Sequence, residues 1–111
     1  MTNSEMNNLK IENNAGAHRW ETRIYGYLAV AEYRRRDDTI FFTHTEVPHE
    51  LEGHGIASKL VQTALDDARS QHLAVVPFCP FVASYIRRHP DYTALVPPRY
   101  RHLVEGDRQN R

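Results

Sequence analysis

The chain has 111 residues, and its 14 basic and 14 acidic side chains balance to a formal net charge of zero. This length suits one domain with a single hydrophobic core. Without a basic excess, we expect no binding to nucleic acid or to an anionic membrane. One cysteine, Cys79, excludes an internal disulfide framework and suits a reducing compartment. No apolar run approaches membrane-spanning length and the N-terminus is polar, so we expect a cytoplasmic protein.

The first half of the chain predicts strands joined by short turns. Residues 1–8 are polar and are expected to be disordered. Aromatic and β-branched residues then alternate with turn residues such as Tyr25-Gly26 and Asp37-Asp38. Short connections imply an antiparallel meander. The expected strands cover residues 9–13, 18–24, 27–34 and 39–47.

The second half predicts two helices separated by one strand. A helix should begin near Gly53 or His54, because apolar residues follow at spacings of three and four. They are Ala57, Leu60, Val61, Ala64, Leu65 and Ala68. The apolar stretch 73–78 should pair parallel to strand 39–47 through a right-handed crossover. A second helix should start at Pro80 and end before Pro90. The charged segment 97–111 is expected to be a flexible tail.

A glycine-rich turn lies between the strand ending at Val47 and the first helix, with the sequence Glu52-Gly53-His54-Gly55-Ile56-Ala57. Glycines allow close backbone approach, and a helix N-terminus offers unpaired N–H donors to a phosphate. A Walker loop is excluded, because Ser58 replaces its second glycine and Leu60 follows Lys59. A dinucleotide fingerprint is weak, because Ser58 replaces its third glycine and the next strand is followed by Cys79 instead of an acidic residue.

The turn instead resembles the coenzyme A-binding motif of the GNAT acyltransferase superfamily, Gln/Arg-x-x-Gly-x-Gly/Ala, with Glu52 departing from its first position. Three further motifs are similar to those of the short GNAT-like N-acetyltransferases: His-Thr-Glu-Val-Pro at 44–48, Pro-x-Cys-Pro-Phe at 77–81, and Tyr-Ile-Arg-Arg-His-Pro at 85–90. The resemblance covers residues 9–96. It implies one α/β (α+β) domain, a GNAT-like domain whose mixed, mostly antiparallel sheet has about five strands and two main helices.

The resemblance implies acetyl-CoA as the substrate that binds at the turn, and no metal. Backbone N–H groups of the turn would hold the pyrophosphate, while the backbone of Val47 would pair with the pantetheine arm. Ser58 and Lys59 are further candidates for phosphate contacts, with a solvated side chain as the alternative for Lys59, which lies on the polar face of the helix. The expected binding residues are Val47, Gly53, His54, Gly55, Ile56, Ala57 and Ser58.

Cys79 is the first catalytic candidate. It follows a strand and precedes Pro80, so it should lie at a helix N-terminus, which favours the reactive thiolate form. The alternative is a buried cysteine that packs as a small hydrophobic residue. Tyr85 and Tyr92 are possible proton donors to the leaving thiolate, with core packing as the alternative.

His44 and Glu46 are the other catalytic candidates. They are two residues apart on a strand and therefore share one face. A protonated amine with a pKa near ~10.4 needs a base at neutral pH. The alternative is a solvent-facing hydrogen-bonded pair. The glutamate that many GNAT enzymes use as base would be at Phe41, so the base stays unassigned. Their neighbours His49 and His54 do not complete a His-Glu-x-x-His zinc motif.

The predicted function is acetyl transfer from acetyl-CoA to a primary amine, either a protein lysine or N-terminus or a small amine. The alternative is a non-catalytic coenzyme A-binding module that acts through protein partners. Larger GNAT enzymes wall the acceptor site with extra elements for which this chain lacks the length. Its acceptor groove should therefore be open in a monomer or completed by the partner subunit of a homodimer.

Overall fold

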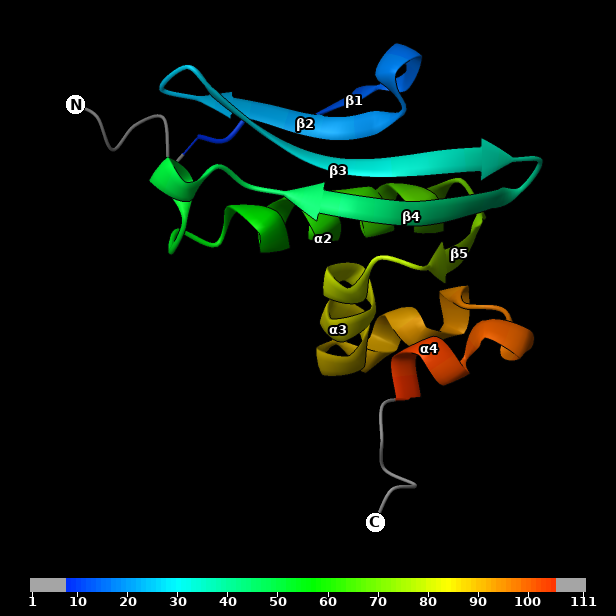
Figure 1. Ribbon diagram of the computed structural model, residues 1–111. Helices are drawn as coiled ribbons and strands as arrows, with labels where there is room; N and C mark the ends of the chain where they lie inside the picture. The colour runs from blue at the N-terminus through cyan, green and yellow to red at the C-terminus, as the bar shows by residue number, and fades with distance from the viewer. Residues whose placement is uncertain (1–7, 106–111) are drawn as a thin grey trace.

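The computed structural model describes residues 8–105, which contain one five-stranded mixed sheet in the order β1-β2-β3-β4-β5 (Figure 1). The first four strands are antiparallel neighbours, and β5 is parallel to β4. The predicted meander and crossover are therefore confirmed, although the first strand begins later than expected. The strands are β1 (Glu12–Asn14), β2 (Arg19–Ile24), β3 (Tyr27–Arg36), β4 (Thr39–Glu46) and β5 (Ala74–Pro77).

The turn between β2 and β3 follows from its two residues. Tyr25 and Gly26 both have positive φ, at 54° and 85°. Two consecutive positive φ angles define the hairpin turn whose twist matches that of paired strands. The turn thereby fixes the register, in which Ile24 faces Tyr27 and Trp20 faces Ala31.

One long helix, α2 (Ile56–Ser70), covers one face of the sheet (Figure 1). The predicted stripe of six apolar residues is buried, except that Ile56 takes the place of the half-buried Ala57. The helix begins at Ile56 and not at Gly53 or His54, because both glycines of the turn adopt positive φ. A right-handed helix excludes such angles.

The helices that follow β5 in the chain gather beside this last strand of the sheet (Figure 1). The second predicted helix is confirmed as α3 (Pro80–Arg88). The other segments are the short helix α4 (His102–Glu105) and four 3-10 helices, η1 (Ala15–Ala17), η2 (His49–Leu51), η3 (Pro90–Leu95) and η4 (Pro98–Tyr100). None of the helices within residues 8–105 combines the length and apolar character needed to cross a membrane.

The expectation of a flexible tail is wrong for the part that the structure describes. Residues 98–105 form η4 and α4, and Val104 is buried in the core. Tyr100 packs edge-on against Phe78 with 5.9 Å between ring centroids. These apolar contacts pack residues 98–105 against the domain, although most residues of this segment are polar or charged. Residues 106–111 of the expected tail, and residues 1–7 of the expected disordered N-terminus, lie outside the described range.

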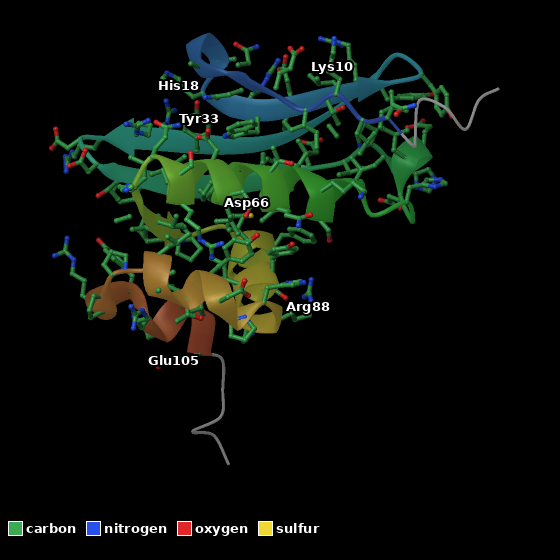
Figure 2. The ribbon with its side chains drawn as sticks, turned by 180° about the vertical axis from the view of Figure 1, so that it is seen from behind. Lys10, His18, Tyr33, Asp66, Arg88 and Glu105 are labelled. Atoms are coloured by element: carbon green, nitrogen blue, oxygen red, sulfur yellow. The ribbon has the colours of Figure 1, made fainter. Side chains whose placement is uncertain are left out.

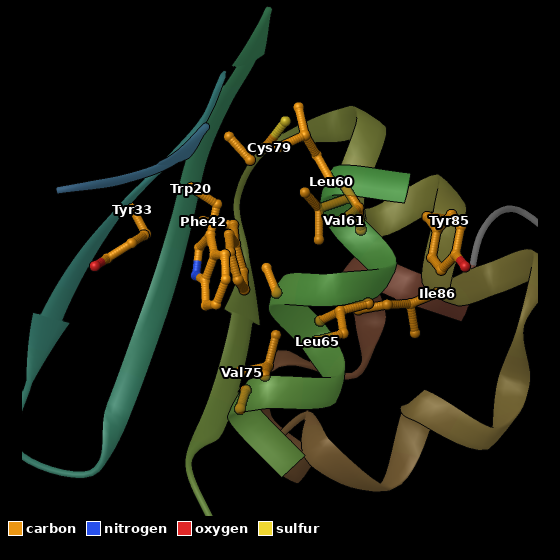
Figure 3. Packing of buried hydrophobic residues seen from close by; sticks show 14 of the residues in the cluster. Trp20, Tyr33, Phe42, Leu60, Val61, Leu65, Val75, Cys79, Tyr85 and Ile86 are labelled. Carbon is orange, nitrogen blue, oxygen red and sulfur yellow. The ribbon is translucent and has the colours of Figure 1, made fainter. Parts of the chain in front are cut away.

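The core lies between the sheet and the helices (Figure 3). Trp20 and Phe42 reach from the strands toward Leu60 and Leu65 of α2, and Ile86 of α3 closes the cluster. Cys79 is at one end of this core. This packing brings the start of α3 close to the middle of β4, and the candidate site lies between these two elements.

Candidate active site

Strands β4 and β5 separate halfway along β4. They pair only from Thr39 to Phe42, and the last backbone contact between them is the Cys79 N–H donating to the Phe42 carbonyl at 2.8 Å. Beyond this point β4 continues to Glu46, paired only with β3, while the chain after Cys79 turns into α3. The free edge of β4 offers backbone groups to an extended ligand, as the resemblance implies for the pantetheine arm.

A β-bulge determines which side chains of β4 face this gap. Tyr33 of β3 pairs with Phe42, but the next residue, Glu32, pairs with His44, so Thr43 is an extra residue on β4. The Thr43 hydroxyl donates to the Glu32 carbonyl at 3.3 Å. An extra residue reverses the alternation that follows. Thr45, which pairs with the buried Ala31, therefore lies on the inner face with the core.

Cys79 is at the predicted position, the N-cap of α3, immediately before Pro80. The residue is only 4% exposed, and its Sγ lies 3.3 Å from the Thr45 hydroxyl. The thiol therefore packs in the core, as the structural alternative expects, and it also borders the gap between β4 and α3, as the catalytic alternative requires. Thr45 was not predicted as a site residue, since its contact with Cys79 spans 34 residues.

His44 and Glu46 share the outer face of β4, as predicted. His44 Nε2 lies 3.2 Å from Glu46 Oε1, and both side chains are more than half exposed. The bulge turns this pair away from Cys79, so the two groups of catalytic candidates lie on opposite faces of one strand. His49 similarly contacts Glu52 at 3.3 Å. Among residues 8–105, no three His, Cys, Asp or Glu side chains are grouped so that they could hold a metal ion.

The glycine turn presents backbone donors at the start of α2. Gly55 is the N-cap, with φ 74° and ψ 19°, and no side chain caps the helix. The first helical hydrogen bond runs from the Lys59 N–H to the Gly55 carbonyl at 3.1 Å. The N–H groups of Ile56, Ala57 and Ser58 precede it and therefore have no partner within the helix. Such donors at the positive end of a helix dipole suit a phosphate.

A groove of about 200 Å³ lies beside this turn. Its lining includes Val47, which follows Thr45 by two residues, and Phe81, which follows Cys79 by two, so the groove approaches the gap between β4 and α3. Six of the seven predicted binding residues line the groove, and His54 does not. Three further residues line the groove but were not among the predicted binding residues: Leu51, which is buried and apolar, Glu52 and Phe81. The complete lining is Val47, Leu51, Glu52, Gly53, Gly55, Ile56, Ala57, Ser58 and Phe81.

The two tyrosine candidates are buried in the core. The Tyr92 hydroxyl donates to Asp66 at 2.7 Å, and Figure 2 marks Asp66 on α2. Burial and this hydrogen bond raise the pKa of Tyr92 above its usual value. Tyr85 stacks on His89, with ring centroids 4.0 Å apart, and burial also raises the pKa of Tyr85. Neither residue lines the groove, which favours the packing alternative for both.

The fold and this arrangement agree with the similarity of the chain to a known protein family. A family model described as GCN5-related N-acetyl-transferase matches residues 19–95, which extend from β2 to the end of η3. The matched stretch contains the bulge, the glycine turn and Cys79. It also covers well over half of the 111 residues. The chain therefore belongs to the GCN5-related N-acetyltransferase family, an acyltransferase family.

Proposed function

We propose that the protein transfers an acetyl group from acetyl-CoA to a primary amine. The observation that carries this proposal is the groove between the free N–H donors at the start of α2 and the gap that Cys79 borders. A pyrophosphate at one end of this groove and a thioester near the other match the ends of the pantetheine arm.

The residues of the turn fit a pyrophosphate. A Cβ atom on Gly53 or Gly55 would meet no other part of the protein within 4 Å, so the space beside both glycines is open. A ligand can therefore approach their backbone closely. The N-terminus of α2 adds the positive end of a 15-residue helix dipole.

In the proposed mechanism, Sγ of Cys79 attacks the thioester carbonyl carbon. A bond forms between Sγ and the acetyl carbon, the bond between that carbon and the coenzyme A sulfur breaks, and the thiol proton ends on the released coenzyme. An uncharged amine then attacks the acetyl-cysteine and forms the amide, and its proton returns to Sγ. The half-exposed pair of His44 and Glu46 is available to accept a proton from the incoming ammonium.

Intact-protein mass spectrometry tests this function. Incubation with acetyl-CoA alone should add one acetyl group to the wild type and none to Cys79→Ala, and an amine should then remove it. Cys79→Ser is the matched control for packing, because it preserves the size of the side chain. Acetylation of an amine without an adduct, and at an undiminished rate in Cys79→Ala, would instead indicate direct transfer.

Two further measurements, of coenzyme A binding and of turnover, separate catalysis from the non-catalytic alternative. Calorimetry should give a dissociation constant for coenzyme A, and a panel of small amines and lysine peptides should give thiol release from acetyl-CoA. Tight binding without thiol release for any amine would support the non-catalytic coenzyme A-binding module. Release with lysine peptides only would identify a protein as the acceptor.

A further inference from the structure

The Cys79 thiol makes a polar contact with the Thr45 hydroxyl. Their Oγ1 and Sγ atoms lie 3.3 Å apart, within the distance for a hydrogen bond to sulfur. Both residues come from ends of regular elements, since Thr45 is in the last part of β4 and Cys79 caps α3. The contact therefore crosses the gap that opens where β4 and β5 separate.

The bulge at Thr43 is what makes this contact possible. In a regular strand, residues alternate between faces, so Thr45 would lie on the face opposite to the buried Phe42. With one extra residue, Thr45 lies on the same face as Phe42 and Ala31. The cost is a local interruption of the ladder with β3. A bulge thus places a hydroxyl group beside the single thiol of the chain.

Both partners continue into the walls of the groove. Val47 follows Thr45 by two residues and Phe81 follows Cys79 by two, and both line the groove that leads to the glycine turn. A thiol directed into this gap faces an incoming ligand, whereas one rotated about its Cα–Cβ bond would point elsewhere in the core. Side chains occupy one of three staggered χ1 rotamers, and a specific contact favours the rotamer that makes it. The hydroxyl supplies such a contact.

We propose that Thr45 is a positioning residue, whose hydroxyl holds Sγ of Cys79 toward the groove for acyl transfer. This role rests on the proposed function, but the orientation of the thiol can be tested without it. Thr45 does not need to contact the acetyl group. Its effect should appear in the rate at which Cys79 reacts and not in the affinity for coenzyme A.

Two variants isolate the hydroxyl. Thr45→Val keeps the branched shape and removes the hydrogen bond, while Thr45→Ser keeps the hydroxyl and removes a methyl group. The net effect of one neutral hydrogen bond corresponds to a change of about 2- to 12-fold in an equilibrium. We expect iodoacetamide to alkylate Cys79 in Thr45→Val at least about threefold more slowly than in the wild type. Thr45→Ser should restore the rate, and melting curves should confirm that both variants are folded.

The outcomes are distinct. Equal alkylation rates in folded Thr45→Val and wild type would overturn the proposal, as would equal slowing in Thr45→Val and Thr45→Ser, because that indicates packing alone. If the wild type forms no acetyl adduct while alkylation still depends on the hydroxyl, the proposed function fails and the positioning role stands. If the proposed function and the positioning role are both correct, the first-order rate of adduct formation should fall in Thr45→Val while the KM for acetyl-CoA stays unchanged.

Discussion

Replacement of Gly55 tests the anion site at the start of α2 most directly. This residue has left-handed dihedral angles, with φ 74° and ψ 19°, and a side chain there would project into open space beside the helix N-terminus. Left-handed backbone costs an L-residue about 1 to 2 kcal/mol, and Asn and Asp adopt it most readily. Gly55→Asn and Gly55→Asp are therefore matched in size and backbone strain and differ by one negative charge.

The expected difference follows from Coulomb's law. Two unit charges about 4 Å apart repel by about 1 kcal/mol in bulk water and by about 4 kcal/mol at an effective dielectric constant near 20. We expect the dissociation constant of coenzyme A to be at least tenfold higher for Gly55→Asp than for Gly55→Asn, which corresponds to about 1.4 kcal/mol. Titration calorimetry measures this ratio, and melting curves establish that both variants are folded.

Ionic strength provides a control for this interpretation. The ratio between the two variants should shrink as salt is added, because mobile ions screen partly exposed charges. Pantetheine, which lacks the pyrophosphate, should bind equally to both. If the folded variants bind coenzyme A equally at low salt, the pyrophosphate does not lie at the start of α2 and the assignment of the glycine turn is wrong.

Three further predictions concern stability. Val104→Ala should lower the free energy of unfolding by about 2 kcal/mol in chemical denaturation, because this buried residue anchors α4, whereas the exposed Glu105→Ala should have little effect. Tyr92→Phe should cost about 1 kcal/mol at neutral pH through its lost bond to Asp66. Burial raises the pKa of Tyr92 in the folded state above its usual value of 10.0. The stability contributed by the neutral phenol is therefore complete below pH 10 and is lost as the pH rises further. The melting temperature of Tyr92→Phe should accordingly fall less at alkaline pH than that of the wild type. Chelator treatment should leave the melting temperature unchanged, because within residues 8–105 no three potential ligands are grouped so that they could hold a metal ion.

The regular part of this fold could be predicted from local sequence signals. Strand alternation, the Tyr25-Gly26 turn and the apolar stripe of α2 each depend on residues close together in the chain. Only the ends of the elements shifted, as at Ile56, where the dihedral angles of Gly55 delay the helix. Local patterns specify such elements because propensity and burial agree there.

The bulge could not be predicted in this way. It depends on how β4 pairs with β3, and regular alternation from Phe42 would place His44 inward and Thr45 outward. The sequence correctly predicted that His44 and Glu46 share a face of the strand. It did not predict that this is the outer face or that Cys79 lies on the opposite side of β4. The order of residues 98–105 was missed for a related reason, since Val104 is held by tertiary contacts that composition does not reveal.

The two faces of β4 lead to a prediction about the separate steps of the reaction. His44 lies on the outer face and Cys79 borders the gap on the inner face, so His44 can assist an approaching amine without contacting the thiol. His44→Ala should therefore leave the rate of acetyl-adduct formation unchanged and slow removal of the adduct by an amine at least about tenfold. This is below the about 10²- to 10⁴-fold effect typical of general base catalysis, because the site is exposed. Rapid-quench mass spectrometry resolves the two rates, with His72→Asn as a control at an exposed, left-handed position after α2. A slower first step in His44→Ala would mean that His44 reaches the thiol, which contradicts the separation that the bulge imposes.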